Sequence, residues 1–356
     1  MYDLVIVGAG LFGSTFAHEV HKKGKKVLVI DKNEHIGGNV YTKNISNIPA
    51  HFYGPHLLHS NSKKIWDYIN QFAEFNNYQH KVKSISGDKI FSLPFNMNTF
   101  QQLWGCVRPN DAKRIIESQK IKIENPSNFE EQALSMVGTD IYHKLVYGYT
   151  KKQWGRNPKE LPASIIKRIP IRFEYNDNYF NDSYQGIPIN GYTEIIENML
   201  KGIEVRLGVD FFKEKIKADK IVYSGSIDEL FNYKHGVLEY RSLRFDHKVL
   251  PTSNFQGIGQ MNYADEAVSF TRIVEPKHFH GTKSEKTLIT YEYPMEWSQG
   301  KPRYYPINDE KNNNLYKLYL SEFKRTGMIG GGRLFEYKYM DMDAVVASAL
   351  VKSNTI

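Results

Sequence analysis

Three glycines near the start of the chain have the spacing of a nucleotide-binding turn. Gly8, Gly10 and Gly13 form the pattern G-x-G-x-x-G, and Asp31 follows further along the chain. The first glycine of such a turn allows a sharp bend, the second lets the backbone approach a pyrophosphate, and the third allows close helix–strand packing. The helix N-terminus attracts the pyrophosphate, and an acidic residue placed like Asp31 can bind ribose hydroxyls. These residues predict a dinucleotide site.

The elements that must position this site can be predicted from the same stretch. The apolar run at 2–7 is typical of a strand, 14–22 of a helix, and 26–30 of a second strand that ends at Asp31. A second glycine turn, which includes Gly38, comes just after this acidic residue and would bring backbone close to a larger cofactor. We therefore expect FAD rather than NAD.

A third glycine run lies near the end of the chain. A short strand at 328–329 runs into Gly330-Gly331-Gly332-Arg333, and 341–351 has the pattern of a helix with Asp341 or Asp343 as its cap. Such a run can be a plain connector. We favour the alternative that it brings a helix N-terminus to the flavin, where the helix dipole would stabilise a reduced, anionic ring.

Composition limits the class of protein. The chain has 356 residues, is 41% hydrophobic and contains one cysteine, so it can bury a large core without a disulfide framework. Apolar runs are too short for a membrane span, and a strand at residue 2 leads us to expect no targeting peptide and a cytoplasmic enzyme. The net charge of +8 fits either a lysine-rich surface or a cleft that attracts an anionic substrate. Scattered basic residues without a recognisable motif argue against nucleic acid.

Other chemically suggestive residues have more than one interpretation. His51, His56 and His59 lack further ligands at metal spacing, so we expect no metal, and His56 can instead act beside the cofactor. Trp154, in what reads as a polar loop, can pack against its own domain or stack on a nucleobase. The basic stretch 167–173 is either a surface loop or a source of an arginine for a diphosphate.

The rest of the chain predicts the overall architecture. Residues 110–149 read as helices broken near Pro126 and Gly138, 203–211 as an alternating strand, 220–225 as a strand returning to the first sheet, and 240–305 as antiparallel strands. The predicted fold class is α/β, with a Rossmann-like FAD-binding domain, an inserted helical domain and an antiparallel β-sheet domain. We expect the FAD domain at 1–80, 190–240 and 318–356, the helical domain at 97–170, and the sheet domain at 81–96, 171–189 and 241–317.

Over essentially its whole length the chain resembles the bacterial UDP-galactopyranose mutases, which are flavoenzymes. The stretches that carry the resemblance are VIVGAGLFGS, HIGGN, YGPH, LPFNMNTF, GYTKKQWGR, KRIPIRF, YQGIP, NGYT, EYRSL, FTRIVE, YYPIN, GGRL and EYKYMDM. The resemblance implies interconversion of UDP-galactopyranose and UDP-galactofuranose on reduced FAD, through a covalent bond between flavin N5 and the sugar. It also implies a homodimer that supplies galactofuranose for cell-surface polysaccharide.

The resemblance implies a role for individual residues of this chain. Arg168, Arg272 and His56 would be catalytic, the two arginines at the diphosphate and the histidine beside flavin N5. The substrate would contact Tyr149, Thr150, Trp154, Tyr179, Asn262, Arg272, Tyr305 and Tyr339. In addition to the glycines, FAD would contact Phe12, Asp31, Lys32, Asn39, His56, Leu57, Arg333, Asp341, Met342 and Val345.

Alternatives remain open for the substrate and for the class of protein. His80 stands where close relatives are expected to have asparagine, and Leu145-Val146 is less aromatic than in some members, so an N-acetylated UDP-hexose is an alternative substrate. A flavin oxidoreductase could share the cofactor fold, although no second dinucleotide pattern is present for its own NAD(P)H site. A non-enzymatic nucleotide-binding module is the third possibility.

Overall fold

The computed structural model describes residues 1–168 and 170–356, and the side chains of 1–166 and 170–356. The chain divides into two units by its internal contacts. Unit 1 comprises Met1–Tyr78, Asp182–Tyr240 and Tyr305–Ile356, and unit 2 comprises Gln79–Asn181 and Arg241–Tyr304. The segments predicted as a helical domain and most of those predicted as a sheet domain share unit 2, whereas residues 182–189 and 305–317, which we predicted as part of the sheet domain, belong to unit 1.

A five-stranded sheet with the order β16-β10-β1-β2-β9 organises unit 1, and all its neighbouring strands are parallel. Its strands are β1 (Tyr2–Val7), β2 (Val27–Ile30), β9 (Glu204–Arg206), β10 (Ala218–Tyr223) and β16 (Ile329–Gly330). In register, Val5 of β1 lies beside Leu28 of β2 and Ile221 of β10. Parallel strands buried on both faces are apolar throughout, which explains the continuous runs at the start of the chain.

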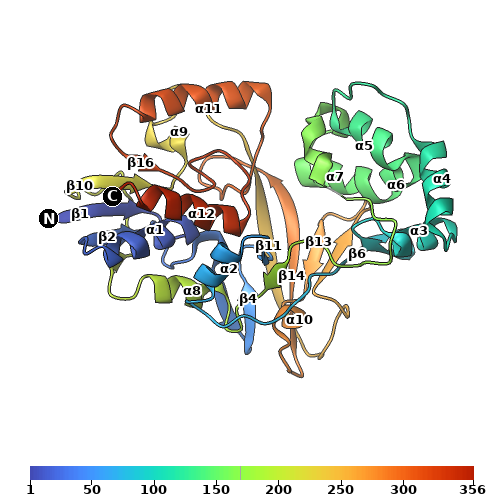
Figure 1. The fold of residues 1–356 in the computed structure, drawn as a ribbon, viewed down its shortest axis with the longest axis horizontal. Helices are drawn as coiled ribbons and strands as arrows, with labels where there is room; N and C mark the ends of the chain where they lie inside the picture. The colour runs from blue at the N-terminus through green and yellow to red at the C-terminus, as the bar shows by residue number, and fades with distance from the viewer. Residues whose placement is uncertain (169) are drawn as a thin grey trace. The chain divides into compact units, whose positions relative to one another are not determined.

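Helices cover one face of this sheet. They are α1 (Leu11–Lys22), α8 (Tyr192–Met199) and α12 (Met342–Ser353), and α1 and α12 lie side by side (Figure 1). Phe16 of α1, Ile196 of α8 and Val346 of α12 are fully buried in one apolar cluster. This arrangement confirms the predicted Rossmann-like domain. The α1 helix begins at Leu11, so the glycine pattern itself forms its N-cap and first turn.

The opposite face of the sheet is covered by irregular chain that we predicted as strand. The predicted strand 203–211 is wrong beyond β9, because the chain bends after Arg206 and the Val209 N–H donates to the Asp31 carbonyl. Val209 and Phe211 then pack against Val5 and Leu28 rather than extending the sheet.

The remaining elements of unit 1 are short or peripheral. They are η1 (Gly38–Val40), β3 (Thr42–Ile45), β4 (Ile48–His51), β5 (Leu58–Ser60), α2 (Lys63–Ile69), β8 (Tyr184–Gly186), α9 (Ile227–Leu230), β15 (Tyr305–Pro306) and α11 (Glu310–Phe323). β3 pairs with β4 and β5 with β8, both antiparallel.

Unit 2 contains a mainly antiparallel sheet with the order β11-β14-β13-β12-β6-β7. Its strands are β6 (Val82–Ser86), β7 (Lys89–Leu93), β11 (Tyr240–Leu250), β12 (Gln260–Tyr263), β13 (Arg272–Val274) and β14 (Thr287–Glu296). Among the strands just named, β12 and β6 pair in parallel, and the other neighbours in this order pair antiparallel. The short helix α10 (Lys277–His280) connects β13 to β14. The antiparallel strands predicted at 240–305 are therefore confirmed.

Apart from α10, the described helices of unit 2 gather in one cluster (Figure 1). They are α3 (Met97–Trp104), α4 (Pro109–Gln119), α5 (Phe129–Val137), α6 (Thr139–Ile141), η2 (Tyr142–Tyr147), α7 (Gly148–Trp154), η3 (Pro158–Glu160) and η4 (Ala163–Arg168). Phe100, Phe129 and Tyr142 are fully buried among them. Asn96 begins α3 with a capping box formed with Thr99, and α5 ends at Gly138, as the predicted break requires.

Candidate functional site

The first glycine turn seats the start of α1 directly against the end of β1. Gly8 has φ +108°, and a Cβ atom there would lie 2.1 Å from Oγ of Ser224. A Cβ at Gly13 would lie only 1.9 Å from the Gly8 carbonyl oxygen. The N-cap, Gly10, has no side chain to accept the first N–H groups of the helix. This turn therefore presents backbone donors that fit a pyrophosphate.

The second glycine turn lies against the first. Gly10 and Gly37 form a β-bridge, and the Gly37 N–H donates to the Ala9 carbonyl over 2.8 Å. A Cβ at Gly38 would lie 3.2 Å from Cα of Gly10, so only glycine allows this approach without displacement. Asn39 follows in η1 and is half-buried.

Asp31 lies at the end of β2 and connects these turns. Its side chain is buried; Oδ2 accepts the Ala9 N–H over 2.8 Å, and Oδ1 accepts the backbone and side-chain N–H groups of Asn33, each over 2.9 Å. A carboxylate has about four acceptor sites, so these three contacts leave capacity for about one ribose hydroxyl. The neighbouring Lys32 is exposed, with Nζ 3.7 Å from Oε1 of Glu229.

The third glycine run lies at the end of β16. A Cβ at Gly331 would lie 2.1 Å from the ring of Phe12, which is buried beneath this run. Nζ of Lys352 donates to the Gly330 carbonyl over 2.7 Å. Because β1, β10 and β16 are parallel neighbours, their carboxyl ends share one edge of the sheet, where open α/β sheets bind ligands. Phe12 thus supports the site as a core residue.

The C-terminal cofactor residues have different surroundings. Asp341 is the N-cap of α12, one of the two positions that we predicted, although its side chain makes no capping hydrogen bond. Asp343 accepts its neighbour's N–H at Ala344 and a hydrogen bond from Ser60 over 2.7 Å. Met342 and Val345 belong to the apolar cluster with α1.

Three predicted site residues of unit 1 form a stack. The guanidinium of Arg333 lies 4.8 Å from the ring centroid of Tyr339. The Tyr339 ring in turn stacks on Tyr305, with centroids 6.1 Å apart and planes at 25°. A cation held against an aromatic face is oriented by it, so this stack fixes a positive charge and two phenols together.

His56 has a defined proton position. Its Nδ1 lies 2.9 Å from the Gly54 carbonyl, and its backbone N–H donates to Nδ1 of His51 over 3.1 Å. A carbonyl can only accept, so Nδ1 of His56 carries the proton and Nε2 is the acceptor in the neutral ring. Leu57 follows and is half-buried.

In unit 2 three neighbouring strands align Asn262, Arg272 and Glu292. Asn262 pairs in register with Arg272, and Arg272 pairs with Glu292. Nε and Nη2 of Arg272 bond to Oε2 of Glu292 over 2.8 and 2.7 Å. Glu292 is fully buried, and among the described residues its Oε1 has no hydrogen-bond partner. Sequence reasoning missed Glu292, although a carboxylate inside a strand rich in apolar and aromatic residues is a recognisable signal.

Tyr149 lies in the electrostatic field of this pair. Burial raises the pKa of its phenol well above the ordinary value; Arg272 opposes the shift, whereas Glu292 and Tyr179 add to it. The structure therefore brings Tyr149, Tyr179 and Arg272 together. Thr150 is buried next to Tyr149 in the chain.

Trp154 is in a helix rather than in the polar loop that we predicted. The segment from Gly148 to Trp154 is α7, which continues directly from the π-helical turn η2. Gly148 permits close packing at the start of α7, since a Cβ there would lie 2.3 Å from the Ala264 carbonyl oxygen. Trp154 is half-buried against the helical cluster, which leaves both packing and base stacking as possible roles.

Tyr179 is 37% exposed, and its N–H donates to the carbonyl of the buried His80 over 2.7 Å. Its ring lies edge-on to His80, with centroids 5.4 Å apart. The side chain of the predicted catalytic Arg168 lies outside the described residues.

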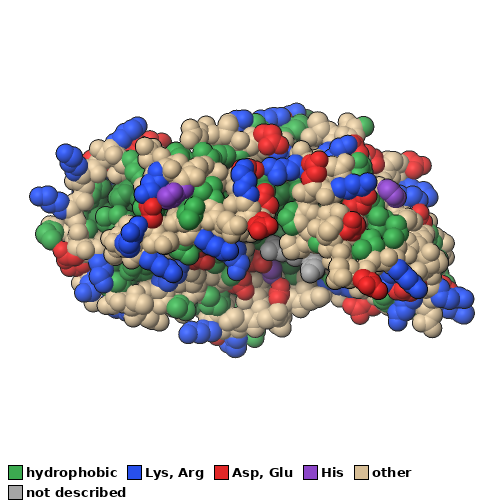
Figure 2. Space-filling view, turned by 90° about the horizontal axis from the view of Figure 1, so that it is seen from above, with side chains coloured by type: hydrophobic (Ala, Val, Ile, Leu, Met, Phe, Trp, Pro, Cys, Tyr) green, Lys and Arg blue, Asp and Glu red, His purple; other side chains and the backbone are tan. Residues whose placement is uncertain are grey.

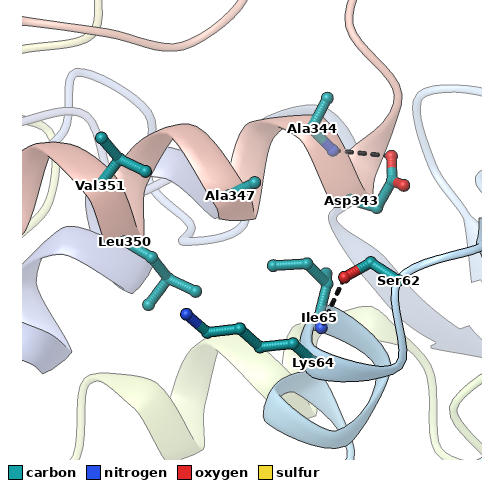
Figure 3. Close-up of a pocket in the computed structure, with 8 residues that line it drawn as sticks. All are labelled: Ser62, Lys64, Ile65, Asp343, Ala344, Ala347, Leu350 and Val351. Atoms are coloured by element: carbon teal, nitrogen blue, oxygen red, sulfur yellow. Dashed lines mark hydrogen bonds between the residues drawn. The ribbon is translucent and has the colours of Figure 1, made fainter.

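Other surface features do not coincide with the predicted residues. A pocket of about 300 Å³ between α2 and α12 is lined by Ser62, Lys64, Ile65, Asp343, Ala344, Ala347, Leu350 and Val351 (Figure 3). One face of the molecule shows Lys and Arg side chains interspersed with acidic ones (Figure 2). Within the described chain, no cluster of three His, Cys, Asp or Glu residues could hold a metal, and no helix is long and apolar enough to cross a membrane.

Comparisons with known proteins decide the family. The family model for UDP-galactopyranose mutase matches residues 144–339, and one for an NAD(P)-binding Rossmann-like domain matches 6–72. A UDP-galactopyranose mutase from Mycoplasma pneumoniae is 31% identical over 100% of this chain and 96% of its own. This chain belongs to the UDP-galactopyranose mutase family. It is therefore a flavin-dependent mutase, and the predicted family and class of enzyme are confirmed.

Relatives within and beyond the UDP-galactopyranose mutases extend this result. A Klebsiella pneumoniae protein named "Probable UDP-galactopyranose mutase" is 39% identical over 98% of this chain and 93% of its own. A dTDP-fucopyranose mutase from Escherichia coli is 36% identical over 98% and 97%. The crystal structure of a reduced UDP-galactopyranose mutase has a TM-score of 0.81 at 14% identity, covering 99% of this chain and 95% of that one, which shows the shared fold.

Proposed function

We propose that this protein interconverts UDP-galactopyranose and UDP-galactofuranose with reduced FAD, and so supplies galactofuranose for cell-surface polysaccharide. One observation carries the proposal. The match to the mutase family model at 144–339 includes every residue that we predicted to contact substrate, from Tyr149 to Tyr339. The resemblance also implies a homodimer, which light scattering after size exclusion would measure.

The residues of unit 1 fit FAD. The glycine turns around Gly8 and Gly38 would hold its pyrophosphate, and Asp31 has acceptor capacity for its ribose. His56 would accept a hydrogen bond at Nε2, because its Nδ1 proton is directed to the Gly54 carbonyl. When bound and reduced, the flavin would supply a nucleophile for the anomeric carbon as the bond from that carbon to UDP breaks, which would allow the sugar to change its ring size.

Arg272 would bind the diphosphate. A guanidinium has five N–H donors, and pairing with Glu292 through Nε and Nη2 fixes its plane without exhausting them. The departing diphosphate gains negative charge, which a pre-oriented cation stabilises. Arg168 would contribute a second guanidinium by the same reasoning.

Tyr149 would act as a hydrogen-bond donor to the substrate. Burial keeps the pKa of its phenol above the ordinary value, so the hydroxyl stays protonated throughout the neutral range. Tyr179, whose phenol interacts electrostatically with that of Tyr149, would also donate a hydrogen bond to the substrate. Trp154 would stack near the uracil, with Thr150 and Asn262 close to the nucleotide or sugar.

A second candidate substrate is dTDP-fucose, favoured by the 36% identity to the Escherichia coli dTDP-fucopyranose mutase. It differs from UDP-galactose in the base methyl group, the ribose 2′-hydroxyl and the sugar 6-hydroxyl, whereas the diphosphate chemistry is shared. With dTDP-fucose as the substrate, the residues discussed above would keep the roles proposed for them.

Product analysis distinguishes these proposals. Purified protein would be incubated with UDP-galactofuranose, dTDP-fucofuranose or the furanose form of UDP-N-acetylgalactosamine, with and without dithionite. We expect UDP-galactopyranose to form only under reducing conditions. Faster turnover of one of the other two sugars would reassign the substrate, and no conversion of any of them by the flavin-loaded protein would refute the mutase proposal.

A further inference from the structure

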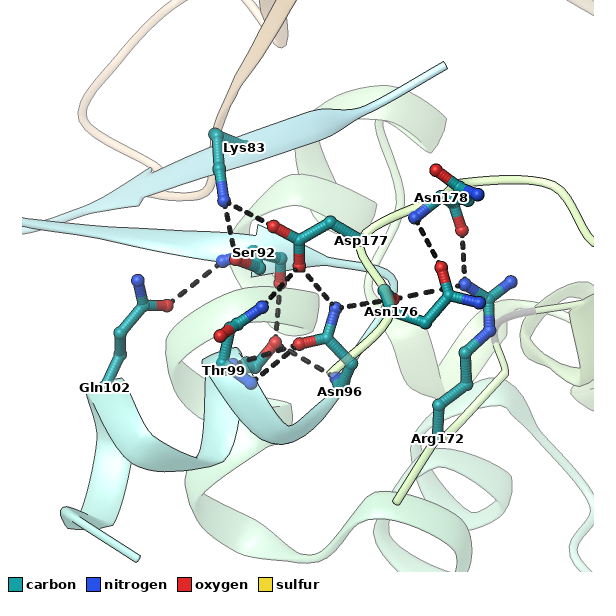
Figure 4. A network of polar contacts seen from close by, with 10 residues as sticks. Lys83, Ser92, Asn96, Thr99, Gln102, Arg172, Asn176, Asp177 and Asn178 are labelled. Carbon is teal, nitrogen blue, oxygen red and sulfur yellow. Dashed lines mark hydrogen bonds and ion pairs between the residues drawn. The ribbon is translucent and has the colours of Figure 1, made fainter. Parts of the chain in front are cut away.

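Residues 170–181 of unit 2 form an irregular segment that carries Tyr179. The segment lies outside helices and strands, and its backbone contacts the rest of the unit through the isolated bridges of Phe95 with Ile171 and Lys81 with Asn178 and through the Glu174 carbonyl, which accepts the Met97 N–H. A segment without regular hydrogen bonding keeps one conformation only if side chains fix it. Two charged side chains of the segment itself, Arg172 and Asp177, do so (Figure 4).

Asp177 ties the segment to α3 and β6. Its Oδ1 accepts hydrogen bonds from Nδ2 of Asn96 and Asn98 over 2.8 and 2.9 Å, and its Oδ2 pairs with Nζ of Lys83 over 3.0 Å. Burial acts to raise the pKa of Asp177, but the bonds from Asn98, Lys83 and Asn96 hold it below the ordinary value. The carboxylate is thus ionised and held by three donors.

Arg172 holds the turn that follows. Its guanidinium is buried and donates through Nη1 to the carbonyls of Asn176 and Asn178, and through Nη2 to the Tyr179 carbonyl over 3.3 Å. Nη2 also donates to Oδ1 of Asn181 over 2.5 Å. One planar fork therefore spans four acceptors between Asn176 and Asn181, which a lysine, with a single ammonium, cannot do.

These contacts converge on the backbone of Tyr179. Its carbonyl accepts from Arg172, and its N–H donates to the His80 carbonyl over 2.7 Å, so both polar backbone groups are fixed. The phenol, 37% exposed, extends from this fixed backbone. We infer that Arg172, supported by Asp177, is a positioning residue that sets the location of the Tyr179 hydroxyl for the substrate. We call the contacts of Arg172 and Asp177 described above the clamp. The inference rests on the proposed function for the identity of the substrate, whereas the clamp follows from the contacts alone.

The first test is independent of substrate. Hydrogen exchange would be followed in the flavin-loaded protein for the peptide covering 176–181, in wild type, Arg172→Gln and Asp177→Asn. We expect exchange of these amides to accelerate about tenfold or more in Arg172→Gln. Arg114→Gln in α4, where the arginine is 80% exposed, removes the same charge and is the matched control. Unchanged exchange in Arg172→Gln would overturn the clamp.

The second test asks whether Arg172 acts through Tyr179. Dissociation constants for UDP would be measured in Arg172→Gln, Tyr179→Phe and the double variant. We expect each single variant to bind UDP about tenfold more weakly, and the double variant to bind no more weakly than Tyr179→Phe. Additive losses would overturn the positioning role. Faster exchange together with a wild-type protein that does not bind UDP would instead refute the proposed function and leave the clamp established. Should Arg172→Gln fail to fold, Asp177→Asn, which keeps the side-chain shape, carries both tests.

Discussion

Replacing Gly13 with alanine isolates the contact that seats α1 on the nucleotide-binding turn. The new Cβ would lie 1.9 Å from the Gly8 carbonyl oxygen and 3.3 Å from Cγ2 of Ile6. Ordinary contact begins at 3.4 Å, so the helix must move outward until the first of these gaps widens from 1.9 Å to 3.4 Å. The carbonyl belongs to the backbone and cannot move aside as a flexible side chain would.

The expected magnitude is the difference of two effects. Forcing a methyl group into a packed interface costs about 1–3 kcal/mol, whereas alanine in a helix interior gains up to about 1 kcal/mol over glycine. We expect a net loss of about 1–2 kcal/mol, or roughly 2–8 °C in Tm. Because the displaced turn is the one proposed to hold the pyrophosphate, flavin content should fall more than stability.

Gly24→Ala is the matched control. Gly24 has φ +81°, and a Cβ there would meet nothing within 4 Å, so alanine costs about 1–2 kcal/mol of backbone strain far from any contact. The assay is the ratio of flavin absorbance to protein absorbance after purification, together with the Tm of each variant. We expect similar Tm losses but full flavin only in Gly24→Ala. A Gly13→Ala protein with full flavin and a raised Tm would show that helix propensity outweighs the contact, and would refute this reasoning.

Two further predictions concern unit 2. Burial lowers the pKa of Lys152 to about 8, below its unfolded value of about 10.5. The buried charge therefore destabilises the folded state fully below about pH 8, and this destabilisation disappears as the pH rises to about 10.5. The free energy of unfolding of the wild type should therefore rise relative to that of Lys152→Met by about 1–2 kcal/mol over this window, after allowing for partial exposure, and urea titrations that show parallel curves would contradict this. Glu292→Gln removes the charge that neutralises Arg272 and should lower the free energy of unfolding in urea by about 3 kcal/mol. This is the lower end for a broken buried ion pair, because the Arg272 side chain is 18% exposed. A loss below about 1 kcal/mol would show that Glu292 does not stabilise the buried charge of Arg272.

The nucleotide-binding part of the fold could be predicted because its signals are local. The glycine pattern, the apolar strand before it and the acidic residue after it all lie between Met1 and Asp31, and the structure places them at one edge of a parallel sheet. The broken helices at 110–149 and the strands at 240–305 were also predicted from local periodicity. An error arises where a distant contact decides: Val209 leaves the predicted strand because its N–H bonds to the Asp31 carbonyl.

The supporting residues of the site could not be predicted from the sequence in the same way. Glu292 is one carboxylate within a strand, and its significance depends on Arg272, which belongs to a different strand and lies opposite it in the sheet. Arg172 was part of a basic stretch for which the sequence left two interpretations open, and its four acceptors all lie downstream in an irregular segment. Pairings of this kind follow from register and from loop conformation, neither of which has a periodic pattern.

The division of the chain has a consequence for its synthesis. The chain passes between the units four times, after residues 78, 181, 240 and 304, so segments of unit 1 lie on both sides of unit 2 in the sequence. The helix α1 ends at Lys22, whereas its packing partner α12 begins only at Met342. At about 5–20 residues per second, the apolar face of α1 waits roughly 15–60 s on the ribosome for the helix that covers it. Unit 1 therefore completes its core only after translation has reached α12. Truncation before Met342 would leave the apolar face of α1, synthesised early in translation, exposed to solvent.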